Sequence, residues 1–405
     1  MRVSTAQFYM QSASQMSNKT SDVNEQMAYL SSGKRVLTAK DDAVAFGTLV
    51  GYKDDLANID KYNRNINQAE NHNSLQEVLF SDAQLILDTV KQDMLLANNG
   101  RMSDEDLQSI ASQVRNSLDQ LLDIANSQDE NGDYLFAGYQ TEKEPFSQQV
   151  DNSVTYNGDA GVRELQVAKN IKVPVSQSGE AAFNKIANAL GDFSATYPVT
   201  PANLSGIAVE QANVTNRSDF NASTTPHNYT FTFNPTAADL VVTDNGGTPV
   251  FTTSTYTAGQ SITFDGIEVT LSGNPLPGDN FTISQEENIS IFSTINDAIE
   301  WMEKGSVSTN QEQHAVDYNT TLNQLNSAMT HISSRQVDSG IRLQVLESQR
   351  SRHLDSQLYL ESGKSRIEDL DFAKAISEFE QSKIALQASQ QSFSKIQNLT
   401  LFNYI

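Results

Sequence analysis

The 405-residue sequence has no cysteine, only five histidines and no apolar run longer than four residues. The absence of cysteine excludes disulfides, thiolate metal sites and cysteine nucleophiles. A membrane span needs ~20 predominantly apolar residues. Because the longest apolar run here is four residues, we expect no membrane partner. The first ten residues lack the apolar segment of a cleaved secretory signal. No histidine stands four residues from another, so the helical zinc motif of metalloproteases is missing.

Basic residues are scarce, since 27 Lys and Arg oppose 50 Asp and Glu and give a formal net charge of −23. Proteins that bind nucleic-acid backbones need basic patches to displace counterions, so we expect no nucleic-acid partner. Residues 1–42 carry five basic and four acidic side chains, and residues 366–405 carry four and five. The two ends together are therefore neutral, which would let them pack against further copies without accumulating like charge.

Motifs that support catalysis are equally sparse. The sequence contains no Gly-x-Ser-x-Gly, Walker or Gly-x-Gly-x-x-Gly pattern. Residues 129–133 (Asp-Glu-Asn-Gly-Asp) imitate the first half of a calcium loop. Tyr134 nevertheless stands where that loop needs glycine, and Gln140 stands where it needs glutamate. We therefore expect a protein that is not an enzyme and that binds neither a cofactor nor a metal.

Proline and threonine concentrate between Gly191 and Asn288, a stretch that holds seven of the nine prolines and seventeen threonines. Apolar and polar residues alternate within it, as in residues 229–233 and 267–271, and this period of two predicts strands. Residues 244–247 (Asp-Asn-Gly-Gly) predict a hairpin with a type I′ turn, which needs positive φ at both central residues. The sequence thus predicts a small all-β outer domain at residues 191–288, inserted into a helical chain.

Both ends of the chain carry apolar residues at every seventh position. The residues of this heptad repeat are Tyr9, Met16, Val23, Leu30 and Leu37 at the N-terminal end, and Phe372, Phe379, Leu386 and Phe393 at the C-terminal end. A second N-terminal line, offset by four, consists of Ala6, Ala13, Thr20 and Met27. Such stripes are typical of coiled coils, so we expect the nine residues of the repeat to form an assembly interface. The alternative is that each helix packs inside its own globule.

Interior segments continue the helical pattern. Apolar residues at 107, 111, 114, 118, 121 and 125 alternate spacings of four and three, and residues 322–346 show a similar register. These segments flank the β region and most simply pair as an antiparallel bundle. We therefore predict a mainly α fold with inserted β. It has terminal coiled-coil helices at 1–42 and 366–405, and a long antiparallel bundle with short β-hairpins at 43–190 and 289–365.

Two motifs resemble the terminal helices of bacterial flagellins and their hook-associated relatives. Residues 30–43 (LSSGKRVLTAKDDA) are similar to the end of the family's N-terminal helix, and residues 366–373 (RIEDLDFA) are similar to the start of its C-terminal helix. Residues 132–141 (GDYLFAGYQT) look more like a hook-associated member than like flagellin. Lys34 favours the same assignment, because an uncharged residue is common at this position in flagellins. Residues 258–281 resemble a β-module shared by both kinds of protein.

The resemblance implies a structural component of the bacterial flagellum, an adapter that joins hook to filament through its N- and C-terminal helices. Flagellin, the bulk filament subunit, is the nearer alternative, and an enzyme or adhesin with its chemistry in residues 191–288 is another. The implied partners are other copies of the chain in a ring, the hook-associated protein FlgK, flagellin and a type III export chaperone. The resemblance also implies an extracellular location, secretion without a cleaved signal peptide, and terminal helices that pair only on assembly.

Overall fold

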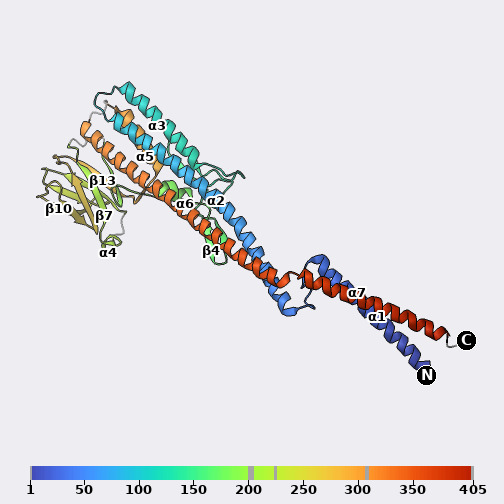
Figure 1. The fold of residues 1–405 in the computed structure, drawn as a ribbon. Helices are drawn as coiled ribbons and strands as arrows, with labels where there is room; N and C mark the ends of the chain where they lie inside the picture. The colour runs from blue at the N-terminus through green and yellow to red at the C-terminus, as the bar shows by residue number, and fades with distance from the viewer. Residues whose placement is uncertain (1, 199–204, 223–225, 306–309, 403–405) are drawn as a thin grey trace. The chain divides into compact units, whose positions relative to one another are not determined.

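The computed structural model of the chain describes residues 2–198, 205–222, 226–305 and 310–402, with side chains for residues 7 and 9–395 of those ranges. Over these residues the chain is mainly helical, with a central antiparallel sheet region. It divides into two compact units, one of residues 1–64 with 348–405 and one of residues 65–347. Residues of the long helices α2 and α6, which are labelled in Figure 1, belong to both units.

The elements have the following bounds. The helices are α1 (Arg2–Ser32), α2 (Ala43–Ala97), α3 (Asp104–Ala125), α4 (Arg217–Phe220), α5 (Ile291–Lys304), α6 (Gln311–Glu368) and α7 (Phe372–Phe402), with a π-helical turn η1 (Glu180–Asn184). The first strands are β1 (Phe146–Gln148), β2 (Val154–Tyr156), β3 (Glu164–Ala168), β4 (Ile171–Pro174), β5 (Ile186–Ala187), β6 (Phe193–Thr196) and β7 (Ala208–Val214). The later strands are β8 (Asn228–Phe233), β9 (Leu240–Thr243), β10 (Pro249–Thr253), β11 (Ser261–Phe264), β12 (Ile267–Ser272), β13 (Asn280–Gln285) and β14 (Asn288–Ile289).

Helix α1 ends earlier than the heptad pattern predicts. Gly33 has φ of 70°, and its N–H donates to the carbonyl of Tyr29 at 2.9 Å. A glycine in the left-handed region just past the last helical residue is a common helix stop, because it has no Cβ to clash. The prediction that Leu37 continues the stripe on this helix is therefore wrong, and Leu37 lies in the irregular segment that joins α1 to α2.

The helical part of the second unit has one apolar core. It is formed by α2, α3, α5 and α6 together with buried residues of the segments between them, among them Phe136, Phe146 and Phe183. The six apolar positions predicted for α3, from Leu107 to Ala125, are all buried. Ser103 begins α3 with a reciprocal capping box to Asp106, which satisfies two free backbone N–H groups. In α5 and α6, the indole of Trp301 stacks on His314 at 4.5 Å and donates to its backbone carbonyl.

Two short hairpins pack beside these helices, β1 with β2 and β3 with β4. Val167 and Val173 of the second hairpin form a separate apolar cluster with Ile66 of α2 and Leu346 of α6. Residues 134–138 fall within the range for which short β-hairpins are predicted. In the structure this segment makes only isolated bridges, at Tyr134 and Ala137, while Phe136 is fully buried in the helical core.

The sheet region has an apolar core of its own, built from residues 193–283. Its sheets are antiparallel, with strand orders β10-β9-β8-β13-β6 and β11-β12-β7. The alternation in the sequence is confirmed, because Tyr229, Phe231 and Phe233 point inward from β8 while the threonines between them are half-exposed. The two-residue strands β5 and β14 pair where the chain enters and leaves this region.

The hairpin predicted at residues 244–247 joins β9 to β10, but the predicted turn type is wrong. Only Gly247 has positive φ, at 78°, whereas Asn245 and Gly246 do not. The carboxylate of Asp244 accepts the N–H groups of Gly246 and Thr248 at 2.9 and 2.7 Å. These two bonds hold a wider loop that needs the left-handed conformation at one residue, so the paired positive φ angles of a type I′ turn are not required.

Candidate assembly interface

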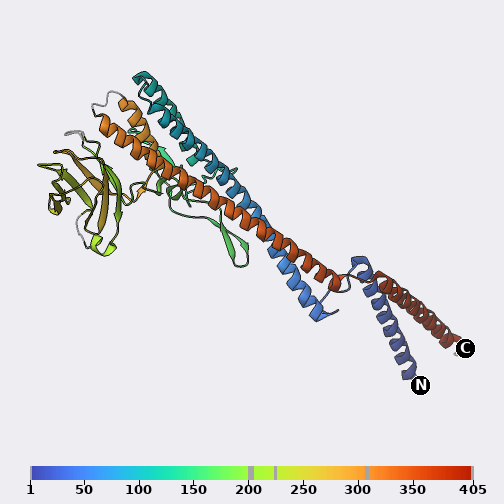
Figure 2. The same ribbon diagram turned by 60° about the vertical axis from the view of Figure 1, so that its left-hand side comes forward.

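Helices α1 and α7 lie side by side and antiparallel (Figures 1 and 2), and their Cα atoms approach within 8 Å. Near the chain ends, the rings of Tyr9 and Phe393 meet edge to face with centroids 6.2 Å apart. At the other end of the pair, Phe372 lies so close to Gly33 that a Cβ there would be 3.6 Å from its ring. The structure thus brings residues of the N- and C-terminal heptad repeats together within one chain.

The two heptad repeats fall in one register. The residue numbers of Tyr9 and Phe393 total 402, and an antiparallel pair with a common seven-residue period keeps that total from layer to layer. The other layers with this total pair Met16 with Leu386, Val23 with Phe379, and Leu30 with Phe372. All of these residues are half-buried except Phe372, which is 52% exposed. Eight of the nine predicted residues therefore share one register on α1 and α7, whereas Leu37 lies beyond the end of α1.

The second predicted line on α1 does not face α7. Ala13, Thr20 and Met27 are exposed, Met27 at 59%, and the side chain of Ala6 lies outside those described. The positions between the apolar layers are small or polar. They are Ser12 and Gln26 on α1, and Ala375, Ser382 and Ser389 on α7. Small side chains allow the close approach of the two helices, but they bury little apolar area. The seam of one chain is consequently a weak one.

Where the helical pair begins, backbone hydrogen bonds join the segment after α1 to the turn between α6 and α7. The N–H of Arg35 donates to the carbonyl of Glu368 at 2.7 Å, and the N–H of Leu370 donates to the carbonyl of Gly33 at 3.0 Å. The guanidinium of Arg35 also donates to the carbonyl of Ile367, 332 residues away in the sequence, at 3.1 Å. The two ends of the chain are therefore tied together at this point.

Three lysines surround the carboxylate of Glu368, which is only 4% exposed. Lys34 Nζ lies 2.7 Å from Oε1, Lys53 Nζ lies 3.4 Å from the same oxygen, and Lys364 Nζ lies 3.9 Å from Oε2. Burial alone would raise the pKa of Glu368, but the hydrogen bond from Lys34 and the charge of Lys53 outweigh it and hold the pKa below its ordinary value. Sequence reasoning singled out Lys34 but missed Glu368, because no local pattern announces a partner so distant in the chain.

A cavity of about 380 Å³ opens beside this tie. Burial and a hydrogen bond to Asp41 raise the pKa of Tyr29 on its wall to about 12. Asp41 in turn accepts the N–H groups of Thr38 and Leu37, at 2.8 and 2.9 Å, and these bonds hold its pKa below the ordinary value. The walls mix acidic and basic side chains, so they select neither an anion nor a cation. The phenol and carboxylate act here as structural groups that shape the segment between α1 and α2.

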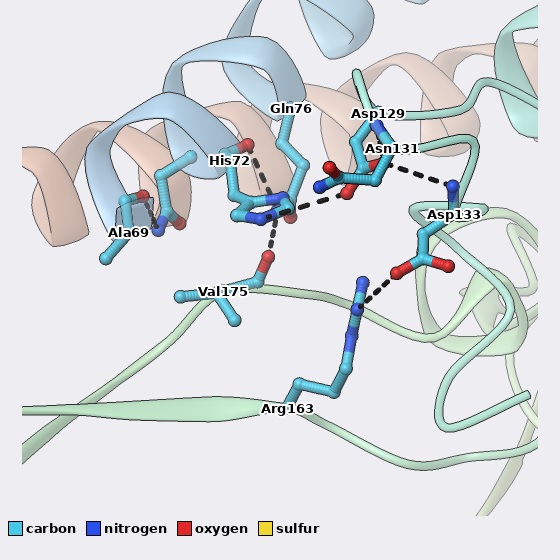
Figure 3. Close-up of polar contacts among 9 residues, drawn as sticks. Ala69, His72, Gln76, Asp129, Asn131, Asp133, Arg163 and Val175 are labelled. Carbon is cyan, nitrogen blue, oxygen red and sulfur yellow. Dashed lines mark hydrogen bonds and ion pairs between the residues drawn. The ribbon is translucent and has the colours of Figure 1, made fainter. Parts of the chain in front are cut away.

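Figure 3 shows the calcium-like residues 129–133 packed against α2. Asp129 Oδ1 accepts the N–H groups of Asn131 and Asp133 at 2.8 and 3.0 Å, and its other oxygen lies 3.9 Å from His72 Nε2. Arg163 approaches the carboxylate of Asp133 at 3.7 Å. Burial lowers the pKa of His72, and the charge of Asp129 opposes that shift. These carboxylates therefore bond to the backbone of the turn and to Arg163.

No group of three or more His, Asp or Glu side chains within the described ranges is placed to hold a metal ion. Among the helices in the part of the chain that the structure covers, none combines the length and apolarity that a membrane crossing needs.

Comparison with known proteins gives three family matches along the chain. Residues 3–141 match the bacterial flagellin N-terminal helical region, and residues 322–405 match the bacterial flagellin C-terminal helical region. Between them, residues 202–285 match a D2-like domain of flagellar hook-associated protein 1. The three matches coincide with α1 to α3, with the sheet region, and with the greater part of α6 together with α7.

Individual relatives are hook-associated proteins. Flagellar hook-associated protein 3 of Escherichia coli K12 is 31% identical over 193 residues, which are 47% of this chain and 60% of the relative. A structure of hook-associated protein 3 from Legionella pneumophila is similar with a TM-score of 0.67 and 31% identity, over 78% of this chain and 98% of the other. A structure of the flagellar junction protein FlgL from the same species gives a TM-score of 0.65 and 30% identity, over 79% and 99%.

Proposed function

Since the chain belongs to the flagellar hook-associated protein 3 (FlgL) family, we propose that it is a structural component of the flagellum, the adapter that joins hook to filament. The chain spans about 60% of the length of the Escherichia coli relative in their match, and 98% of the Legionella structure. The observation that carries the proposal is the single register of the heptad repeats of α1 and α7. A protein that assembles through its termini needs both terminal helices to hold their apolar residues in one common register.

Assembly would complete a surface that one chain leaves uncovered. Met27 on α1, together with Phe372, Ile376 and Ile384 on α7, remains more than half exposed. Fully burying an apolar side chain of this size contributes ~1.5–3 kcal/mol, so a neighbour that covers several of them gains substantially. We infer that further copies of the chain, arranged in a ring, pack on this surface as a coiled coil and strengthen the weak seam.

The proposal assigns a role to each part of the chain. The terminal segments 1–42 and 366–405 form the assembly domain, residues 43–190 and 289–365 form an antiparallel bundle that supports it, and residues 191–288 form an outer domain. The separate apolar core of residues 193–283 supports the last assignment. The first compact unit also includes residues up to 64 and from 348, so the assembly domain rests on the adjoining ends of α2 and α6.

The remaining proposed partners are the neighbours that an adapter requires. These are FlgK on the hook side, flagellin on the filament side, and a type III export chaperone before assembly. The location would be extracellular, in the flagellum, after export without a cleaved signal peptide. The role is non-enzymatic, and the family matches to hook-associated proteins support it over an enzyme carried on the filament.

The position of the protein on intact flagella tests the proposal against flagellin. Gold-labelled antibody against residues 191–288 is expected at one spot between hook and filament. Protein counting should likewise give a few copies per flagellum, because an adapter occupies a short ring. Label along the entire filament, with copy numbers that match the bulk subunit, would refute the adapter and favour flagellin.

A further inference from the structure

We propose that Glu368 is a positioning residue that fastens the terminal helices α1 and α7 to the rest of the first unit. Together with Lys34, Lys53 and Lys364 it forms what we name the charge clamp. This inference goes beyond the adapter function and does not depend on it, since it concerns the free chain. It gives Lys34, the residue that departs from the flagellin pattern, a physical role.

The members of the charge clamp come from separate segments. Lys34 stands in the segment after α1, Lys53 in the third turn of α2, and Lys364 one turn before Glu368 on α6. Glu368 itself is the last residue of α6, and three residues separate it from Phe372, where α7 begins. One buried carboxylate therefore links the exit of α1, the first part of α2 and the entry of α7.

Lys34 is the member that secures α1. Its ammonium makes the shortest contact with Glu368, at 2.7 Å, and it lies next to the backbone bond from Arg35 to Glu368. Without Lys34 the carboxylate would keep Lys53 and Lys364, but neither of these belongs to the segment after α1. Without the carboxylate, three ammonium groups would face one another around a neutral side chain. Both losses are costly, because a buried charge needs its partner.

The clamp matters because the seam beyond it is weak. The layers of small and polar residues between α1 and α7, such as Ser382 and Gln26, contribute little apolar burial. Segments with few buried apolar contacts open locally at low free energy, whereas tied turns open less often. The charge clamp and its backbone bonds therefore set where order ends in the free chain. Local opening in the free chain is therefore expected within α1 and α7, while residues 33–38 and 367–371 stay closed.

Hydrogen exchange of the full chain, followed by mass spectrometry, tests the clamp. Glu368→Gln and Lys34→Gln are expected to speed exchange at least tenfold in residues 33–38 and 367–375, while residues 65–347 exchange as in the wild type. The double variant is expected to be no faster than the faster single variant, because the two side chains act as one pair. Lys34→Arg, which keeps a cation, is expected to retain most of the protection.

Matched controls lie on the same helices. Glu361 on α6 and Lys61 on α2 are exposed, so Glu361→Gln and Lys61→Gln are expected to leave exchange unchanged. Unchanged exchange in Glu368→Gln would overturn the proposal. Faster exchange across residues 65–347 in the same variant would also overturn it, because Glu368 would then stabilise the whole chain rather than position its ends. Equal effects in the control variants would show that loss of any charge suffices, and would reject the clamp.

Discussion

Replacing Phe379 with aspartate is expected to open the seam between α1 and α7. Phe379 lies mid-seam on α7, half-buried, in the layer whose register places it opposite Val23. Fully burying a phenylalanine contributes ~1.5–3 kcal/mol, so a half-buried ring contributes about 1–1.5 kcal/mol. The new carboxylate adds a cost, because it loses water without gaining a partner among the apolar layers. A change of one to two kcal/mol shifts the ratio of closed to open pairs by a factor of ~5–30.

Hydrogen exchange in the free chain measures that shift directly. Faster exchange is expected in α1 and α7 beyond the charge clamp, with the thermal midpoint of residues 65–347 unchanged. Gln381→Asp is the matched control, because Gln381 is exposed and lies off the seam on the same helix. In cells, the Phe379 variant is expected to be exported and to leave hooks intact, while flagellin escapes into the medium for lack of a platform. Wild-type swimming together with wild-type exchange in α1 and α7 would refute the seam.

Three further measurements follow from the same contacts. Limited trypsin digestion of the full chain is expected to cut after Lys19 and Lys383 before it cuts at Lys34, and early cleavage at Lys34 would contradict the tied turns. Excision of residues 191–285 with a short Gly/Ser bridge is expected to preserve the helical core, since β5 and β14 pair at the base, whereas loss of folding would show a shared core. Acid is expected to release the charge clamp. The pKa of Glu368 is lower in the folded chain, so its stabilisation is present above the unfolded value near 4.5 and disappears as pH falls through the folded pKa. The protection of residues 33–38, measured against the intrinsic exchange rate at each pH, is therefore expected to fall between pH 5 and pH 3, and unchanged protection would contradict this.

The periodicity of apolar residues in the sequence was sufficient to predict a helix or strand wherever one face of that element is buried. The alternation at Tyr229, Phe231 and Phe233 predicts a half-buried strand, and the spacing from Leu107 to Ala125 predicts the buried face of α3, because both patterns record which side chains leave water. The heptads at the chain ends predict a stripe in the same way. The heptads do not identify which segment packs on the stripe. In the structure that segment is the other terminal helix of the same chain.

The features that escaped prediction depend on single residues or on distant contacts. Gly33 stops α1 through its backbone angle, so Leu37 keeps the seven-residue spacing without sharing the helix. Asp244 holds its loop through side-chain hydrogen bonds, which the Asn-Gly pair does not reveal. Glu368 is one of fifty acidic residues, and only the folded chain distinguishes it by bringing Lys34 to it.

The seven-residue repeat of the seam has a consequence for how the two helices find each other. If α7 slid along α1 by one heptad, Phe393 would meet Met16 in place of Tyr9, and three of the four apolar layers would form again. The seam by itself therefore allows several alignments that differ by whole heptads. The bonds between Gly33 and Leu370 and between Arg35 and Glu368 fix which of these alignments the two helices adopt. Pairing is thus expected to propagate from these bonds outward, as a zipper closes from its fixed end, and a misaligned pair would first have to break them.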